Sequence, residues 1–314
     1  MNKIPRKEFI IIGIFSLLGI ISCEKESDED KQKRIDDATI REYLDQNSIS
    51  ATEDPRGFYY EKLIENENGQ NVGEGKVVAV RYKISTLEGN LLEDLITEDS
   101  SVLFRQGTGN VFPLGFDYGI GLMKPHEKYK FYIPSYLAYF DYSNSSLFPS
   151  YCNFIVEAIV DSVFSQTDRF ETEQDSIESY LISKQITYEE FVSGLYYSEV
   201  TLGTGDSPLY GNYVKIHFTR KTLKGEILLT TTNGDPVTFI VGTGAAVEGL
   251  EEGLKQMREE GKASLYMPSK IGFGASLRIL PSGLMNDFYE EGIVYTNVPP
   301  YEPLCYEVEL LDVY

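Results

Sequence analysis

The sequence contains the same domain twice. The segment IREYLDQNSI followed by GFYY, residues 40–60, returns as IESYLISKQI followed by GLYY at residues 177–197. The match continues through glycines, prolines and aromatic residues, and the offset between the copies slides only from 137 to 134. Self-similarity of this length is the signature of a duplicated unit. Each unit is long enough to bury its own core, so we expect domain 1 at residues 36–163 and domain 2 at residues 164–314.

The second copy carries an insertion that the first copy lacks. After Gly274 it gains ASLRILPSGLMNDFYEEGIVYTN, residues 275–297, and the copies then align again at Pro149 and Pro299. An insertion between two matching segments belongs in a surface loop. Its apolar residues are mixed with acids, as in a lid or in a helix that faces a partner.

Hydrophobic periodicity predicts the same elements in both copies. Each begins with an amphipathic helix, and Asp175 or Ser176 is the expected cap of the second. Strand-like segments follow at residues 76–85, 102–107, 128–135 and 153–163, and at residues 213–222, 237–242, 262–269 and 305–313. A short helix is expected between the second and third of these, at residues 116–123 and 250–257. The fold class is therefore α+β, in which a mostly antiparallel, curved sheet wraps around one short helix in each domain.

A glycine-rich stretch at residues 239–257, FIVGTGAAVEGLEEGLKQM, looks at first like a phosphate-binding turn. Gly242 and Gly244 are followed by Gly249 rather than by a glycine three residues on, and no GK[ST] is present, so the spacing of a nucleotide site fails. The glycines are better explained by a tight turn from a strand into a helix that packs closely on the sheet.

The formal net charge of −21 argues against nucleic acid as a partner, because such binding depends on clustered Lys and Arg. The two histidines, His126 and His217, fall at non-equivalent positions, so we expect no metal site and no histidine-based catalytic pair. Cys152 and Cys305 are also non-equivalent. Buried thiols are the favoured interpretation, and an intrachain bridge stays open.

The N-terminus predicts export and anchoring. A basic start is followed by an apolar run from Phe9 to Ile21 and by Ser22-Cys23, which is typical of a signal peptide, residues 1–22. The residues Ile20 to Cys23 resemble a bacterial lipobox, which implies lipidation of Cys23 and a membrane partner; a plain signal anchor is the alternative. Residues 23–35 are expected to form an acidic tether.

The sequence EKESDEDKQ after Cys23 resembles the Lys-plus-acidic signals that send some lipoproteins of the Bacteroides group to the cell surface. This resemblance implies a cell envelope lipoprotein of the outer membrane, with surface exposure left open.

Domain 2 contains, in order, the segments V-x-I-H-F-T, P-V-T-F-x-V-G-T-G, V-x-G-L-E-E-G-L-x-x-M, L-Y-M-P-S-x-x-G-F-G and V-P-P…Y-E-V-E-L-L. This framework resembles the FKBP-type peptidyl-prolyl cis-trans isomerases over nearly all of residues 194–314. Domain 1 keeps the same frame as V-R-Y, G-T-G, G-F-D-Y-G-I-x-x-M, Y-I-P-S-Y-L-A-Y and F-P-S…V-E-A-I. A lipoprotein with two such domains is similar to envelope proteins of the Bacteroides group.

The resemblance implies an enzyme that binds proline-containing polypeptides and needs no cofactor. Rotation about a peptide bond meets a barrier of about 18–20 kcal/mol, so the catalyst must bind the twisted amide better than either planar isomer. A water-poor, aromatic pocket with a few polar groups meets this requirement, because leaving water costs the polarised planar amide more.

Carried over by position, the resemblance implies two sets of site residues. The catalytic residues of domain 1 would be Tyr82, Glu93 as the acidic residue, Phe116 at the pocket floor and Tyr139 as a hydroxyl donor to a substrate carbonyl. The other wall residues of domain 1 would be Leu92, Val102, Phe112, Phe148 and Val156. The substrate-binding residues of domain 2 would be Phe218, Leu228, Val237, Val247, Leu250, Phe273, Val298 and Tyr306. Plain core packing is the alternative for each.

Both copies depart from the family pattern. Trp is usual at the pocket floor, yet the chain has none, and Phe116 and Leu250 stand there. Domain 2 has Leu229 in place of the acidic residue and Phe273 in place of the tyrosine, which removes two polar contacts. Domain 1 keeps both groups, although Phe140 replaces a glycine and Pro113-Leu114 adds a residue, so domain 1 is the favoured catalyst.

Three functions remain open from the sequence. The first is an envelope-tethered prolyl isomerase or folding helper for exported polypeptides. The second is a non-catalytic binding or chaperone module that uses its clefts or residues 275–297. The third is a surface spacer or adhesion protein with decayed isomerase pockets.

Overall fold

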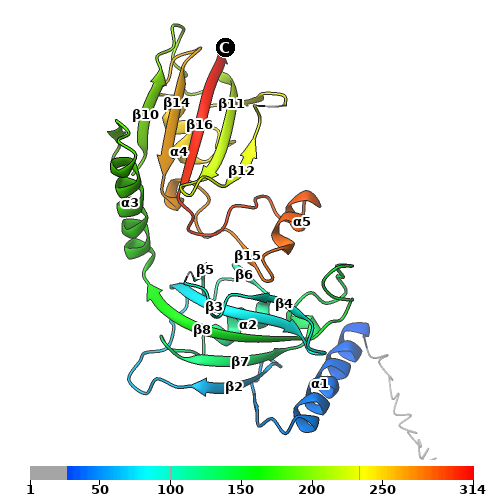
Figure 1. The fold of residues 1–314 in the computed structure, drawn as a ribbon. Coiled ribbons are helices and arrows are strands. Elements are labelled where there is room, and N and C mark those ends of the chain that lie inside the picture. The colour runs from blue at the N-terminus through cyan, green and yellow to red at the C-terminus, as the bar shows by residue number, and fades with distance from the viewer. Residues whose placement is uncertain (1–26, 100, 233) are drawn as a thin grey trace, which may run out of the picture.

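The computed structural model describes residues 27–99, 101–232 and 234–314 as two sheet-containing domains (Figure 1). Cys23 and the predicted signal peptide lie outside the described residues. Each domain has a seven-stranded sheet in which every strand pairing is antiparallel. The predicted α+β class, with two domains of the same architecture, is confirmed.

Domain 1 runs from a leading helix to a long last strand. Its sheet has the order β1-β2-β7-β8-β3-β4, and β5 also pairs with β3. The elements are α1 (Asp28–Gln46), β1 (Thr52–Glu53), β2 (Tyr59–Ile64), β3 (Val77–Thr86), β4 (Leu91–Asp94), β5 (Val102–Arg105), β6 (Val111–Phe112), α2 (Leu114–Ile120), β7 (Lys128–Ile133), the 3-10 helix η1 (Ser135–Leu137) and β8 (Phe154–Phe164).

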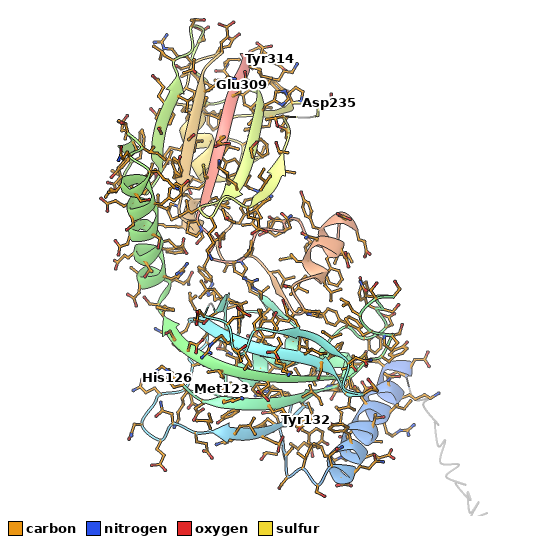
Figure 2. The ribbon with its side chains drawn as sticks, in the orientation of Figure 1. Met123, His126, Tyr132, Asp235, Glu309 and Tyr314 are labelled. Carbon is orange, nitrogen blue, oxygen red and sulfur yellow. The ribbon has the colours of Figure 1, made fainter. Side chains whose placement is uncertain are left out.

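Domain 2 repeats this plan with the order β12-β11-β16-β14-β10-β9, and β13 pairs with β11. The elements are α3 (Gln166–Ser183), β9 (Glu189–Glu190), β10 (Tyr196–Thr201), β11 (Tyr213–Thr222), β12 (Ile227–Thr230), β13 (Val237–Ile240), α4 (Glu248–Leu254), β14 (Lys262–Met267), the 3-10 helix η2 (Ser269–Ile271), β15 (Arg278–Ile279), α5 (Leu284–Glu290) and β16 (Leu304–Val313). Tyr314, after β16, lies at the end of domain 2 remote from domain 1 (Figure 2).

The short helix of each domain packs on one face of the sheet because alternate strand residues are apolar. Val80, Tyr82 and Ile84 on β3 are fully buried, and the residues between them are only partly buried. Phe116 and Ile120 of α2 join these strand residues in one hydrophobic cluster. The equivalent cluster of domain 2 is separate and includes Leu250 and Leu254 of α4 among its buried residues.

Several helix boundaries differ from the expected ones. The short helices α2 and α4 begin two residues earlier than predicted. Helix α1 begins at Asp28, inside the segment expected as a tether, because the Ser27 hydroxyl caps the backbone N–H of Asp30 at 3.0 Å. Helix α3 is capped by Ser165 in a capping box with Asp168. The expected cap at Asp175 or Ser176 was therefore wrong.

Each leading helix docks on its own domain through a buried carboxylate. The Ser135 hydroxyl donates to Asp36 at 2.6 Å. In domain 2 the backbone N–H and hydroxyl of Ser269 donate to Glu173 at 2.6 and 3.1 Å, and Arg169 pairs with the same carboxylate. Burial raises the pKa of Asp36 and raises the pKa of Glu173 to about 7.

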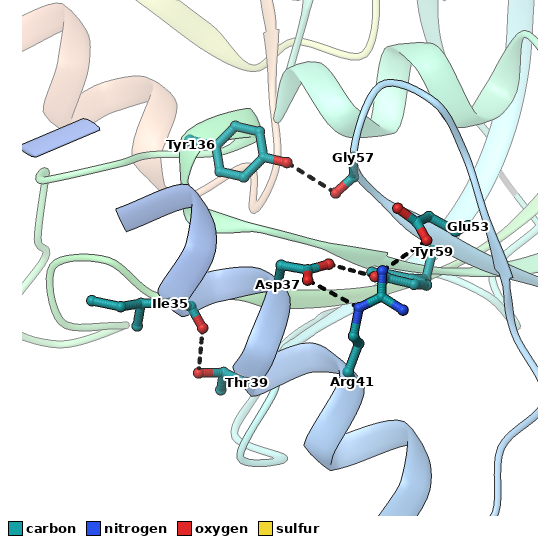
Figure 3. Close-up of polar contacts among 8 residues, drawn as sticks. All are labelled: Ile35, Asp37, Thr39, Arg41, Glu53, Gly57, Tyr59 and Tyr136. Carbon is teal, nitrogen blue, oxygen red and sulfur yellow. Dashed lines mark hydrogen bonds and ion pairs between the residues drawn. The ribbon is translucent and has the colours of Figure 1, made fainter. Parts of the chain in front are cut away.

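The exposed side of α1 holds a second set of polar contacts (Figure 3). Arg41 donates to Asp37 at 2.9 Å and to Glu53 at 2.8 Å. Tyr59 donates to the other oxygen of Asp37 at 2.5 Å, and Tyr136 donates to the carbonyl of Gly57. The contacts of Asp37 and Arg41 fix α1 against β1 and β2, and Tyr136 of η1 holds the turn between these strands.

The insertion of domain 2 crosses to domain 1, and β15 and α5 lie between the two sheets (Figure 1). Strand β15 pairs in parallel with β6 of domain 1. The Phe112–Pro113 and Leu280–Pro281 peptide bonds are cis. The two domains are thus joined by α3 and by the pairing of two short strands that lie far apart in the chain, β6 at residues 111–112 and β15 at residues 278–279.

Cys152 and Cys305 are both free and buried, and burial raises the pKa of each thiol to about 12. Across the residues that the structure describes, none of the helices is both long and apolar enough to cross a bilayer.

Candidate functional site

The candidate site of domain 1 lies where α2 faces the sheet. Phe116 of α2 is completely buried, with its ring centroid 6.3 Å from that of Tyr82 on β3. Phe104 and Phe131 flank the same ring at 5.8 and 6.3 Å. The floor of the site is therefore an aromatic cluster from which water is excluded.

Tyr139 lies in the loop after η1 and belongs to the same apolar cluster as this floor. Its ring packs against Phe112, Phe148 and Phe154 at 5.4, 5.0 and 5.7 Å. Burial raises the pKa of the Tyr139 hydroxyl well above its ordinary value. The group therefore stays protonated and acts as a hydrogen-bond donor.

Glu93 of β4 supplies the acidic group at the edge of the site. The Tyr82 hydroxyl donates to its carboxylate. Burial, and then the charge of Glu93, raise the pKa of Tyr82, so Tyr82 also remains a donor. The carboxylate keeps further acceptor positions for backbone or hydroxyl donors.

The structure brings the predicted residues of domain 1 into one place. The eight apolar and aromatic ones belong to a single cluster, and Glu93 contacts that cluster through Tyr82. Tyr82, Phe116, Tyr139, Phe148 and Val156 are buried members of the cluster, whereas Leu92, Val102 and Phe112 are partly buried and pack against it.

The domain 1 site is occupied by residues 278–282 of domain 2, which we call the docked segment. The Arg278 N–H donates to the carbonyl of Asn110 at 2.9 Å, and the Leu280 N–H donates to the carbonyl of Phe112 at 2.8 Å. The Tyr139 hydroxyl donates to the carbonyl of Leu280 at 2.7 Å. That carbonyl belongs to the peptide bond that precedes Pro281.

The acidic group of the site is engaged by the same segment. The backbone N–H of Ser282 donates to Glu93 at 2.9 Å, and the Ser282 hydroxyl also donates to this carboxylate. Leu280 is completely buried and Pro281 is buried. A leucyl-prolyl unit of the chain itself therefore lies among the residues that the sequence predicted for a substrate.

The candidate site of domain 2 is an open cavity of about 620 Å³. Six of the eight predicted residues line it, namely Phe218, Val237, Val247, Leu250, Phe273 and Tyr306. Leu228 and Val298 do not line it. Leu228 lines a neighbouring cavity of about 380 Å³ that also includes Arg278 and Ile279, and Val298 is buried in the core of domain 2.

Sequence reasoning missed several residues that line the domain 2 cavity, among them Arg220, Phe239 and Tyr295. Arg220 is only 6% exposed, and its guanidinium lies 4.7 Å from the ring centroid of Phe273. It follows Phe218 by two residues on β11, so strand alternation places it on the same face. Tyr295 gave no such signal because it belongs to the insertion.

The polar character of the two sites differs. In domain 2, Leu229 and Phe273 stand where domain 1 has Glu93 and Tyr139, so these two positions offer neither a carboxylate nor a hydroxyl, and the polar groups of the cavity come from other residues such as Arg220 and Tyr306. Within the part of the chain that the structure describes, no group of three or more His, Cys, Asp or Glu side chains could hold a metal ion.

Comparison with known proteins assigns both domains to one family. The family model described as "FKBP-type peptidyl-prolyl cis-trans isomerase" matches residues 68–155 and 205–311. The chloroplastic peptidyl-prolyl cis-trans isomerase FKBP16-3 of Arabidopsis thaliana is 30% identical over 119 residues, 38% of this chain and 48% of that protein. The FK506-binding protein of Neisseria meningitidis serogroup B is 30% identical over 124 residues, 39% of this chain and 99% of that protein.

The chain thus spans about half the length of the Arabidopsis relative and nearly all of the Neisseria relative. Among solved structures, the three FKBP domains of wheat FKBP73 match with 17% identity and a TM-score of 0.34, over 84% of this chain and 99% of that one. FkpA from Escherichia coli matches with 22% identity and a TM-score of 0.36, over 47% of this chain and 62% of that one.

Proposed function

Because the chain belongs to the family of FKBP-type peptidyl-prolyl cis-trans isomerases, we propose that it isomerises prolyl bonds in exported polypeptides and that domain 1 carries the reaction. The isomerase family predicted from the sequence is confirmed. One observation carries the assignment of the reaction to domain 1. Its Tyr139 hydroxyl donates to the carbonyl that precedes a proline, at 2.7 Å.

The residues of domain 1 can favour a twisted amide without forming any covalent bond. The aromatic floor around Phe116 excludes water, which costs a planar, polarised amide more than a twisted one. Tyr139 holds the carbonyl oxygen of the residue before proline, as it holds that of Leu280. Glu93 accepts a hydrogen bond from the residue after proline, as it does from Ser282. Each 1.4 kcal/mol of preference for the twisted state gives about a tenfold rate.

An isomerisation assay on the full-length chain tests this function. With a peptide that contains Leu-Pro, we expect a rate above that of buffer. Tyr139→Phe should lower kcat/KM about fivefold to tenfold, because it removes one hydrogen bond worth about 1 kcal/mol. Tyr151→Phe is the matched control, since Tyr151 is an exposed tyrosine of the same domain. A rate equal to that of buffer, both in the full-length chain and in a variant whose residues 275–297 are replaced so that the domain 1 site is empty, would remove the enzymatic function.

We also propose that the chain is a lipoprotein of the outer membrane in a bacterium of the Bacteroides group. The support is the short apolar run that ends at Cys23 and the acidic sequence that follows it. Several acyl chains on Cys23 would hold the protein firmly on a membrane.

Cell fractionation tests the anchor. Cys23→Ser should move the protein from the membrane fraction into the soluble fraction, because the substituted chain cannot be lipidated. Retention of the variant in the membrane fraction would instead favour a plain signal anchor. Protease treatment of whole cells would then separate a surface orientation from a periplasmic one.

A non-catalytic polypeptide-binding function is the second candidate, and the cavity of domain 2 favours it. This cavity is open and has several apolar and aromatic side chains in its wall, and Leu229 and Phe273 replace the carboxylate and the hydroxyl that domain 1 has at the equivalent positions. If a variant that lacks isomerase activity still suppresses the aggregation of an unfolded polypeptide, the result supports a chaperone. If that variant does not suppress aggregation, a role as a surface spacer or adhesion protein remains.

A further inference from the structure

We propose that the docked segment, residues 278–282, is a tethered ligand of domain 1, and that domain 1 acts on external polypeptides only when this segment leaves the site. The inference rests on the proposed function, because it concerns the regulation and the substrate class of the same site. It follows from how the segment is held, which groups it engages and what anchors it.

The docked segment is held as an extended peptide by main-chain contacts. Strand β15 runs parallel to β6 of domain 1, and two backbone N–H groups of the segment donate to carbonyls of residues 110 and 112. The Asn110 side chain also donates to the carbonyl of Ala275. Addition of a strand to an exposed edge is a general mode of peptide recognition, in which main-chain bonds give affinity and pockets read side chains.

The segment uses both polar groups that the site offers to a substrate. Tyr139 donates to the carbonyl before Pro281, and Glu93 accepts two hydrogen bonds from Ser282. Leu280 is completely buried in the cluster of domain 1, and Ile279 is only 1% exposed. An external peptide cannot reach Tyr139 or Glu93 while these contacts persist.

Helix α5 anchors the docked segment beside the site. Leu284, Met285 and Phe288 of α5 are buried in the cluster of domain 1. The ring of Phe288 meets Tyr142 edge-on at 5.0 Å, and Asn144 donates to Asp287 at 2.9 Å. The docked segment and the helix α5 that anchors it are therefore one continuous stretch of the insertion.

The same contacts define a substrate class for the open site. The preferred peptide is extended, with a branched aliphatic residue two positions before proline and leucine directly before it, as in Ile279-Leu280. A small residue with a hydroxyl group follows the proline, where Ser282 contacts Glu93. Such a peptide must compete with the docked segment, which is tethered to the same chain. A ligand on a short flexible tether has an effective concentration in the millimolar range.

Binding of a labelled peptide tests the inference. The peptide LRILPSGL, residues 277–284, is titrated into the full-length chain and into a variant in which residues 275–297 are replaced by DYSNSSL, residues 141–147 of domain 1. Domain 1 closes the equivalent connection with this loop, so the replacement suits the fold. We expect binding to the shortened variant at least tenfold tighter. Adding Tyr139→Phe to it should weaken binding about fivefold to tenfold.

A point variant tests the same inference without shortening the chain, so the result does not depend on the folding of the shortened variant. Leu280→Gly removes the most buried side chain of the docked segment and should also tighten peptide binding. Ile293→Gly is the matched control, because Ile293 belongs to the same insertion and is 56% exposed. This control should bind the peptide as weakly as the unaltered chain.

The outcomes separate this inference from the proposed function. Tighter binding together with faster isomerisation in the shortened variant supports both. Tighter binding without isomerisation supports the tethered ligand and removes the enzymatic function. Equal binding in the unaltered, shortened and Leu280→Gly chains overturns the tethered ligand, and isomerisation by the unaltered chain would then leave the proposed function standing.

Discussion

Replacement of Phe116 by alanine is expected to lower the free energy of unfolding of domain 1 by about 3–5 kcal/mol. The side chain is completely buried, and rings of Tyr82, Phe104 and Phe131 surround it within 6.3 Å. Rigid rings cannot collapse into the space that the substitution leaves, so the loss includes both transfer energy and a cavity. Denaturant unfolding of the full-length chain measures the effect.

Two controls make this experiment specific. Leu91→Ala removes an apolar side chain that is 56% exposed in the same domain and should change stability by less than about 0.5 kcal/mol. Leu250→Ala makes the equivalent change in domain 2 and should act on that domain's transition. A loss below about 1 kcal/mol for Phe116→Ala would contradict a tightly packed pocket floor.

The stability of domain 2 is expected to fall between about pH 5 and pH 8, and Glu173→Gln should remove this fall. Burial raises the pKa of Glu173 from 4.5 to about 7 in the folded protein. The folded state therefore keeps a proton that the unfolded state releases above pH 4.5. The stabilisation is complete below pH 4.5 and is lost as the pH rises through 7.

The expected size of this change in unfolding free energy follows from the shift in the pKa of Glu173. Because one pKa unit corresponds to about 1.4 kcal/mol, the difference in unfolding free energy between the unaltered chain and Glu173→Gln should change by roughly 3 kcal/mol over this range. Glu171→Gln, on the exposed side of the same helix, is the control. A difference that does not vary with pH would show that the Arg169 and Ser269 contacts fully compensate the buried charge.

The sequence predicted the fold class and those helices and strands whose apolar residues recur at a regular spacing. The segment 213–222 was expected as a strand and is β11, because its alternation places Val214, Ile216 and Phe218 on one buried face. The short strands β2 and β10 were missed, since each has a buried beginning and an exposed end and so lacks alternation. The cap of α3 was missed because its first turns are polar and gave no apolar period.

The candidate residues of domain 1 could be found because they lie within the repeated frame, where strand and helix positions set their spacing. The sequence could not predict in the same way that the docked segment occupies this site. The contact between Tyr139 and Leu280 joins residues 141 positions apart, and RILPSG has no period that indicates its partner. Arg220 was missed for a different reason. Strand alternation places it on the same face as Phe218, but the site residues were taken from the family resemblance, which assigned no role to this position.

The packing of Leu280, Leu284 and Phe288 into domain 1 has a consequence for the order in which the chain matures. Domain 1 is complete in sequence at about residue 163, yet part of its apolar cluster is supplied by residues as late as Phe288. A first domain that folds before these residues are in place presents an uncovered apolar surface, and its closure waits for most of the second domain.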